Sequence, residues 1–318
     1  MAKKKSEGYL SARESRRISR ENRRITTAYE KKRKRKNVPE SEYLTTMKDP
    51  RNAVEFDDLH THFFTDAGVV KAVDGVSFEV PIGKTVGVVG ESGCGKSVTS
   101  LSLMQLLQRP QGQVVGGSIR LNLGDKAYDV AKMPDEKVRN LRGNFVSMIF
   151  QEPMTSMNPV MQVGKQVEES LRVHTKLSPA QRKERALESL AQVELPNPSE
   201  IYRKYPHQLS GGQLQRIMIA AAIVSRPKLL LADEPTTALD VTVQAQILAL
   251  LKKINRESGM GILFISHDLH VVRKLCTRVA VMEQGKLVEL DTVDAIYQRP
   301  AHPYTKKLIS AIPHREGN

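Results

Sequence analysis

The strongest constraint on the fold is the segment Gly90-Glu91-Ser92-Gly93-Cys94-Gly95-Lys96-Ser97, here called the phosphate loop. It matches the pattern G-x-x-x-x-G-K-[ST], follows the apolar run Thr85–Val89 and precedes a predicted helix over Val98–Gln108. Glycines allow backbone N–H groups to turn inward around phosphate oxygens, and a helix N-terminus adds its dipole. We therefore predict a nucleotide phosphate site, with Lys96 at the β and γ phosphates and Ser97 as a ligand of Mg²⁺. A glycine turn without a ligand is the alternative, and the flanking strand and helix disfavour it.

A second signal is the apolar run Leu229-Leu230-Leu231-Ala232, which is followed directly by two acidic residues. The run predicts a buried strand, and ligands of open α/β sheets bind at the carboxyl ends of the strands. We predict that Asp233 holds Mg²⁺ through water and that Glu234 orients or deprotonates an attacking water. An ordinary acidic turn is the alternative reading of this segment alone.

Two polar residues follow other predicted strands. Gln151 comes directly after Phe145–Phe150, and His267 stands two residues after the apolar strand that ends at Ile265. Either residue alone would be read as a surface or core side chain. Because the carboxyl ends of parallel strands meet at one edge of a sheet, we expect both side chains to lie near Glu234.

The segment Ser210-Gly211-Gly212-Gln213 precedes a predicted helix that ends at Val224. Ser210 can cap this helix, and the two glycines leave backbone donors exposed. The segment is either a second anion site or a simple helix N-terminus, and the residues alone leave both readings open.

Positive charge is concentrated in residues 1–50, here called the basic extension, and the rest of the chain has more nearly equal numbers of acidic and basic residues. The net charge of the 318 residues is +14, and residues 1–50 hold 16 Lys and Arg against 7 Asp and Glu. Residues 1–50 have only a thin apolar face, so we expect a solvated extension that is disordered or partly helical. The alternative is attraction to an anionic surface, either lipid head groups or RNA.

Strands and helices alternate from residue 52 to about residue 300, which predicts an α/β fold with parallel strands buried on both faces. Short strands are expected at residues 54–56 and 69–73. A mainly helical stretch, residues 152–208, is expected as an inserted subdomain, and residues 301–318 form a short C-terminal tail. The absence of an internal repeat predicts one nucleotide cassette.

No apolar run is long enough to span a membrane, and two cysteines favour a reducing cytosol over a disulfide framework.

The order of these motifs, with Ala238-Leu239-Asp240 between Glu234 and His267, resembles the ATP-binding cassette family over residues 52–313. The resemblance implies a P-loop NTPase nucleotide-binding domain with a mixed or parallel sheet and an inserted helical subdomain. It also implies that two cassettes face head to tail, so that the Ser210–Gln213 segment of one closes over ATP bound to the other. It further implies that Gln151 senses Mg²⁺ and the attacking water and that His267 contacts the γ-phosphate. Asp240 would couple the two sites across the dimer, and Phe63 would stack on the adenine. Two alternatives to adenine stacking by Phe63 are that the adjacent Phe64 stacks on the adenine and that Phe63 is only a core residue.

A narrower resemblance concerns the transported solute. Residues 151–159 and 299–305 are similar to segments of oligopeptide and dipeptide importer ATPases. This implies an ATP-hydrolysing subunit that uses ATP and Mg²⁺ at the cytoplasmic face of the cell membrane. The implied partners are two transmembrane permease subunits, a second ATPase subunit and, indirectly, an extracytoplasmic solute-binding protein.

The sequence leaves three alternatives to peptide import. The first is import of another solute such as nickel or glutathione. The second is a soluble cassette ATPase that acts on nucleic acid or ribosomes through the basic extension, which the single cassette disfavours. The third is a regulatory cassette without catalysis, which the intact Asp233-Glu234 pair and Ser210–Gln213 segment disfavour.

Overall fold

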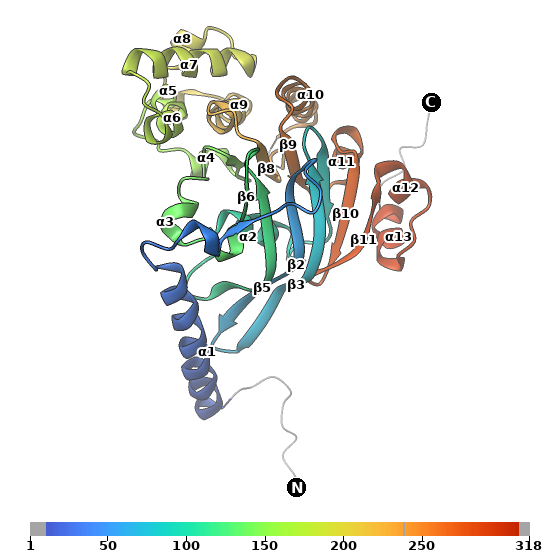
Figure 1. The fold of residues 1–318 in the computed structure, drawn as a ribbon. Helices are drawn as coiled ribbons and strands as arrows, with labels where there is room; N and C mark the ends of the chain where they lie inside the picture. Colours follow the sequence, from blue (N-terminus) through green and yellow to red (C-terminus); the bar gives the residue numbers. More distant parts are fainter. Residues whose placement is uncertain (1–10, 238, 312–318) are drawn as a thin grey trace.

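The structure, a computed structural model, describes residues 11–237 and 239–311 (Figure 1). Ala238 and the outermost parts of the predicted extension and tail, residues 1–10 and 312–318, lie outside the described residues.

A six-stranded sheet forms the centre of the molecule, with strand order β11-β10-β4-β9-β8-β7. Neighbouring strands from β10 to β7 pair in parallel, and β11 pairs antiparallel to β10. The strands are β4 (Thr85–Val89), β7 (Val146–Ile149), β8 (Leu229–Asp233), β9 (Gly261–Ile265), β10 (Arg278–Glu283) and β11 (Lys286–Thr292). Burial on both faces explains why these strands read as continuous apolar runs.

Alternate side chains of this sheet enter two different cores. Leu230 and Phe264 pack in one core with the helices behind the sheet, whereas Leu231 and Leu263 pack in the other. The second core also contains Phe56 and other residues of the second sheet. The central sheet is therefore the shared wall of two cores.

The second sheet is antiparallel and has the strand order β1-β6-β5-β2-β3. Its strands are β1 (Leu44–Thr45), β2 (Asn52–Thr65), β3 (Gly68–Pro81), β5 (Gly112–Asn122) and β6 (Ala127–Asp129). The strands β2 and β3 are much longer than the short strands predicted at 54–56 and 69–73. The β2 ladder contains several register shifts, so its polar residues break the simple alternation that sequence analysis relies on.

Helices cover the sheets and form one separate layer, shown at the top of Figure 1. This layer, between β7 and β8, consists of α4 (Pro153–Ser156), α5 (Val163–Val167), α6 (Glu169–His174), α7 (Pro179–Gln192), α8 (Pro198–Ile201) and α9 (Gly211–Ile223). The remaining helices are α1 (Ala12–Arg33), α2 (Lys96–Met104), α3 (Asp135–Val138), α10 (Val241–Ser258), α11 (Leu269–Leu275), α12 (Val293–Gln298) and α13 (Pro303–Ser310). Among the described residues, no helix has both the length and the apolar character needed to cross a bilayer.

The extension was expected to be disordered or partly helical, and its described part contains a regular helix, α1, which lies beside β2 and β3 (Figure 1). Polar contacts replace the missing apolar face. The Asn22 side-chain amide donates to the Thr65 carbonyl at 2.8 Å, and Arg33 donates to the Asp135 carboxylate at 3.0 Å. Hydrophobic periodicity cannot detect a helix that is held by hydrogen bonds of this kind.

Candidate nucleotide-binding site

The phosphate loop connects β4 to α2 and packs closely against two other strands. A Cβ atom built on Gly90 would lie 2.2 Å from the Met282 carbonyl oxygen of β10, and one on Gly95 would lie 2.2 Å from the Ala72 carbonyl oxygen of β3. Both glycines also have positive φ values, 150° and 104°. Glycine is therefore required at both positions for the loop to close.

The side chain of Lys96 lies inside this loop. The residue is 5% exposed, and its ammonium donates to the carbonyl oxygens of Gly90 at 2.9 Å and Glu91 at 3.0 Å. By contrast, the loop residues Glu91, Ser92 and Gly93 are exposed. The arrangement places one fixed positive charge within a ring of backbone groups, as a phosphate site needs.

Ser97 and Asp233 meet at the base of the loop. The Ser97 hydroxyl donates to the Asp233 carboxylate at 2.8 Å, and Asp233 is 9% exposed. Burial raises the pKa of Asp233; the Ser97 hydrogen bond opposes this shift, and the negative charge of Glu234 adds to it. A buried carboxylate beside a hydroxyl is a set of hard oxygen ligands, the chemistry that Mg²⁺ prefers.

Glu234 is the centre of a hydrogen-bond cluster. Its Oε2 atom accepts from the Gln151 side-chain amide at 3.2 Å and the Thr237 hydroxyl at 3.1 Å, and it lies 3.1 Å from His267 Nδ1. Glu234 has a left-handed backbone, with φ 46°, and its N–H donates to the Ile265 carbonyl at 3.0 Å. The structure therefore brings Gln151, Glu234 and His267 together, beside Asp233.

Two contacts of this site were missed by the sequence analysis. Thr237 stands three residues after Glu234, and nothing in a turn-forming Pro-Thr-Thr run specifies which hydroxyl returns to the carboxylate. Tyr304, on α13, accepts a hydrogen bond at 2.9 Å from the Glu91 backbone N–H. These residues are 213 positions apart, so no local pattern could have indicated the pair.

The Ser210–Gln213 segment lies apart from this cluster, at the start of α9. Ser210 caps the helix by accepting from the Gln213 N–H at 3.3 Å, and Gln213 accepts from the Ser210 N–H at 3.0 Å. A Cβ atom on Gly212 would lie 2.9 Å from Val243 of α10, whereas one on Gly211 would meet no atom within 4 Å. Among the described residues, no hydrogen bond joins this segment to the phosphate loop. The predicted capping by Ser210 is confirmed.

Asp240 and Phe63 occupy different structural positions. Asp240 caps α10 by accepting from the Val243 N–H at 2.9 Å, next to the Ser210–Gln213 segment. Phe63 is half-buried on β2, where it pairs with Val70 of β3 and Gly112 of β5. Val70 stands two residues before Ala72, the β3 residue whose carbonyl packs on Gly95 of the phosphate loop.

Cys94 is buried within the loop, and burial raises the pKa of its thiol. A protonated, buried thiol is a poor nucleophile, so the residue serves the loop through its backbone. Its carbonyl accepts from the Gly285 N–H at 3.0 Å.

Comparison with known proteins yields consistent matches in sequence and structure. The ABC transporter family model matches residues 73–237, and the model of the oligopeptide/dipeptide transporter C-terminal region matches residues 288–318. The dipeptide transport ATP-binding protein DppD of Bacillus subtilis (strain 168) is 47% identical over 261 residues, which cover 82% of this chain and 77% of that protein. A probable peptide ABC transporter ATP-binding protein, y4tR of Sinorhizobium fredii (strain NBRC 101917 / NGR234), is 46% identical over 258 residues, covering 81% and 76% respectively.

A solved structure shares the fold. The ATP-binding cassette MJ0796, in a dimeric post-hydrolysis state bound to ADP and Pi, aligns with a TM-score of 0.66 and 27% identity. The alignment covers 76% of this chain and 98% of that one.

The buried Asp233 carboxylate yields a prediction about pH and stability. The pKa of Asp233 is higher in the folded protein than in the unfolded chain. Between these two pKa values, the folded protein binds more protons than the unfolded chain. The free energy of unfolding therefore falls as pH rises through this range. Without nucleotide, Asp233→Asn is expected to raise the urea midpoint at pH 7 and to have little effect near pH 3.5, where the carboxyl is already protonated. Equal effects at both pH values would contradict this. The control is Asp125→Asn, at an exposed position.

Proposed function

The chain belongs to the ATP-binding cassette transporter family, and from this premise we propose that it hydrolyses ATP to power the import of dipeptides or oligopeptides. The observation that carries the reaction is the convergence of Lys96, Asp233 and Glu234 at one edge of the central sheet. The match of residues 288–318 to the oligopeptide/dipeptide transporter C-terminal region supports peptide import over nickel import or an action on nucleic acid.

Binding of ATP uses groups that are already in position. The phosphate loop supplies backbone N–H donors at the N-terminus of α2, and the Lys96 ammonium exchanges its carbonyl partners for phosphate oxygens. We propose that Phe63 stacks on the adenine. Since Gly90 and Gly95 pack directly on neighbouring carbonyls, the loop changes shape little on binding, which favours electrostatic stabilisation of the transferred phosphoryl group.

We propose that Mg²⁺ is bound by Ser97 and Asp233, with Gln151 close by. The metal would neutralise charge on the phosphate oxygens when bound. The Ser97 hydroxyl oxygen and the Asp233 carboxylate, which are 2.8 Å apart, would hold the cation between them and the phosphates. A bound cation would offset the unfavourable burial of the Asp233 charge.

We propose that Glu234 orients and deprotonates the attacking water. Its Oε2 atom is held by Gln151, Thr237 and His267, so the second carboxylate oxygen is fixed in direction. Gln151 and His267 are exposed, and we propose that Gln151 contacts the water and His267 the γ-phosphate. Because Glu234 follows the last residue of β8, its carboxylate is aimed from a rigid sheet edge.

A second cassette is needed to complete the site. Among the described residues, the Ser210–Gln213 segment makes no hydrogen bond to the phosphate loop of its own chain. It places the exposed Gly211 and the half-buried Gly212 at the N-terminus of α9. We propose that this segment binds the γ-phosphate held by the second cassette, with Asp240 beside it at the interface. The dimeric state of MJ0796 is consistent with this arrangement.

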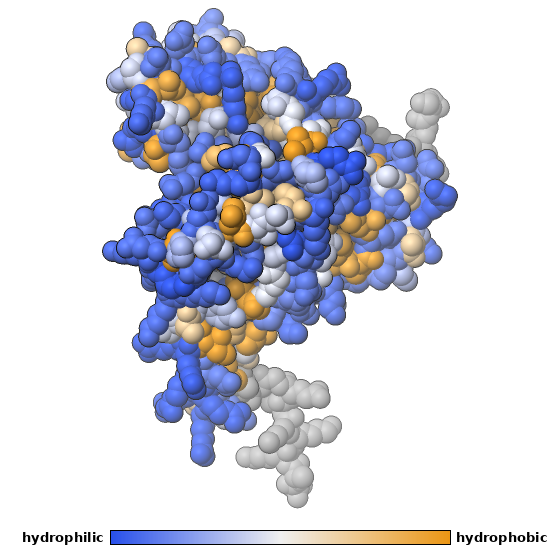
Figure 2. All heavy atoms as spheres, in the orientation of Figure 1, coloured by the Kyte–Doolittle hydropathy of each residue, from blue (hydrophilic) through white to orange (hydrophobic). Residues whose placement is uncertain are grey.

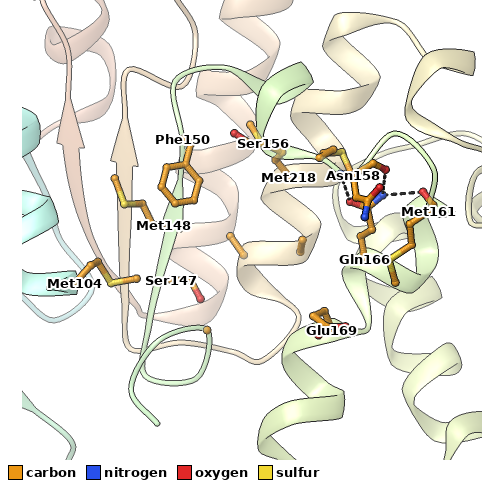
Figure 3. A pocket seen from close by; sticks show the side chains of 14 residues that line it. Met104, Ser147, Met148, Phe150, Ser156, Asn158, Met161, Gln166, Glu169 and Met218 are labelled. Carbon is orange, nitrogen blue, oxygen red and sulfur yellow. Dashed lines mark hydrogen bonds between the residues drawn. The ribbon is translucent and has the colours of Figure 1, made fainter. Parts of the chain in front are cut away.

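A methionine-rich groove supports binding of permease subunits. The groove, about 470 Å³, lies between the end of α2, β7 and the helices α4–α6 and α9 (Figure 3). Met104, Met148 and Phe150 line one side, and Met161 and Met218 line the other. Methionine side chains adapt their shape to a partner. We propose that a short helix of each permease enters this groove, so that ATP-driven movement of α4–α9 reaches the membrane subunits.

The exposed face of α1 supports an orientation toward the membrane. Its buried stripe faces β2 and β5, and its outer face is covered by hydrophilic side chains (Figure 2). The exposed cations are Arg13, Arg16, Arg17, Arg20, Arg23, Arg24, Lys31, Lys32 and Lys34. The C-terminal end of α1 contacts the residue that follows the groove residue Met104, because Arg33 donates to the Gln105 side chain at 2.7 Å. We propose that this basic face meets anionic lipid head groups beside the permease.

The catalytic role of Glu234 is tested by Glu234→Gln. The amide keeps an acceptor for the three neighbours but cannot take a proton, so ATP turnover is expected to fall by about 100-fold or more while ATP binding is retained. Steady-state phosphate release and fluorescent ATP titration measure the two effects. The exposed Glu257→Gln serves as the control. Undiminished phosphate release in Glu234→Gln would remove Glu234 from the mechanism.

The need for a second cassette is tested by Gly211→Leu. Since Gly211 is exposed and a Cβ atom built on it meets no atom beyond its own helix within 4 Å, folding and ATP binding should be unchanged. ATPase activity of the assembled importer should fall by about 100-fold, because the leucine excludes the phosphate of the facing cassette. The control is Ala191→Leu, at an exposed position of α7. Full activity in the Gly211 variant would refute the proposed closure.

The orientation of α1 is tested with vesicles. At about 1 kcal/mol for each basic residue near an anionic surface, neutralising Arg16, Arg20 and Arg23 to Gln should weaken binding to phosphatidylserine vesicles about 100-fold. The matched control neutralises the exposed Lys252, Arg256 and Lys274. Equal losses in both triple variants, or binding to RNA with no binding to vesicles, would contradict the proposal.

A further inference from the structure

A second cluster of ligand-type side chains lies on β2 and β3, outside the nucleotide site. One ligand atom each from His60, His62 and Asp74 lies within 4.8 Å of the others. His60 and Asp74 are direct cross-strand partners, and His62 stands two residues further along β2. Thr61, between the histidines, is fully buried and contacts Ser102 of α2 at 2.8 Å. The two imidazoles therefore project from the opposite face of the strand.

A neutral His60 can satisfy only one of its two carboxylate neighbours. Its Nε2 atom lies 3.2 Å from the Asp58 carboxylate and its Nδ1 atom lies 3.1 Å from the Asp74 carboxylate. A neutral imidazole carries one N–H. If Nε2–H donates to Asp58, the Nδ1 lone pair faces the negative Asp74 oxygen. A metal ion bound by both Nδ1 and Asp74 turns this repulsion into two coordination bonds.

The surrounding residues have the arrangement of a metal centre. Histidine ligands commonly donate their second ring N–H to a carboxylate, which fixes the ring, and Asp58 is placed to accept that bond from His60. His62 Nε2 is buried with no hydrogen-bond partner among the described residues. The side chains of His60 and Asp74 are 29% and 21% exposed, so a cation can enter and retain water as a further ligand. Lys71 lies 3.6 Å from Asp74 and would share that carboxylate with the metal.

We propose that His60, His62 and Asp74 bind a divalent transition-metal cation, with Asp58 positioning His60. Two imidazoles and one carboxylate suit Zn²⁺, Co²⁺ or Ni²⁺ and exclude Mg²⁺, which prefers oxygen ligands. The site joins β2 to β3 close to Ala72, whose carbonyl packs on Gly95 of the phosphate loop. A bound ion therefore stiffens the hairpin on which the loop rests. The inference does not depend on the proposed transport function.

The test is titration of the tag-free chain with Zn²⁺ or Co²⁺ alone, in a buffer that does not bind metals and without nucleotide. We expect one more equivalent of Zn²⁺ in the natural chain than in His62→Ala, and a visible Co²⁺ spectrum that the variant lacks. Asp58→Asn should keep the site and weaken its Zn²⁺ affinity about 10-fold to 100-fold, as loss of an outer carboxylate does. Zn²⁺ should also raise the thermal midpoint of the natural chain more than that of His62→Ala.

His267→Ala is the matched control, because His267 and Glu234 could bind Zn²⁺ at the nucleotide site. The His267→Ala variant should still bind the equivalent of Zn²⁺ that His62→Ala loses. Equal stoichiometry and equal Co²⁺ spectra in the natural chain and His62→Ala would overturn the proposal, and the cluster would then be a protonated His60 between two carboxylates. If His62→Ala does not fold, Asp58→Asn carries the test, and an unchanged Zn²⁺ affinity in that variant overturns the proposal.

Discussion

The register of four parallel strands determines the position of every group in the reaction. Val88 of β4 and Asp233 of β8 both pair with Ile265 of β9, and Ile149 of β7 pairs with Ala232. The phosphate loop, Glu234, His267 and Gln151 therefore all begin within two residues of one line across the sheet. A shift of one residue in any pair would turn each side chain to the opposite face and separate the carboxylate from the lysine.

This geometry is obtained at a cost in stability. A carboxylate is buried at Asp233, where its charged form is disfavoured, and a left-handed backbone is imposed on Glu234. Two well-packed cores on either side of the sheet offset these local penalties. The strained and desolvated groups, Glu234 and Asp233, belong to the candidate nucleotide site, and departures from local rules are expected at functional sites.

Sequence analysis could predict the parts of the molecule that follow from local pattern. The apolar run Leu229–Ala232, the glycines of the phosphate loop and the cap formed by Ser210 each depend on neighbours in the chain. Contacts that depend on tertiary structure were beyond it. Helix α1 docks through Asn22 and Arg33 and not through an apolar stripe, and Thr237 reaches Glu234 through a turn. His60 and Asp74 lie opposite each other because β2 pairs with β3. The register shifts in this ladder prevent prediction of the pair from the alternation of residue types.

The hydrogen bond between Tyr304 and the phosphate loop has a consequence for biosynthesis. The tyrosine is made 213 residues after Glu91, whose backbone N–H it accepts. A ribosome releases β4 and α2 long before it has polymerised α13. During that interval the Glu91 N–H has no Tyr304 to bind, so the nascent loop lacks one of its supports. The phosphate loop therefore gains this support only after α13 has been synthesised and has folded back against it.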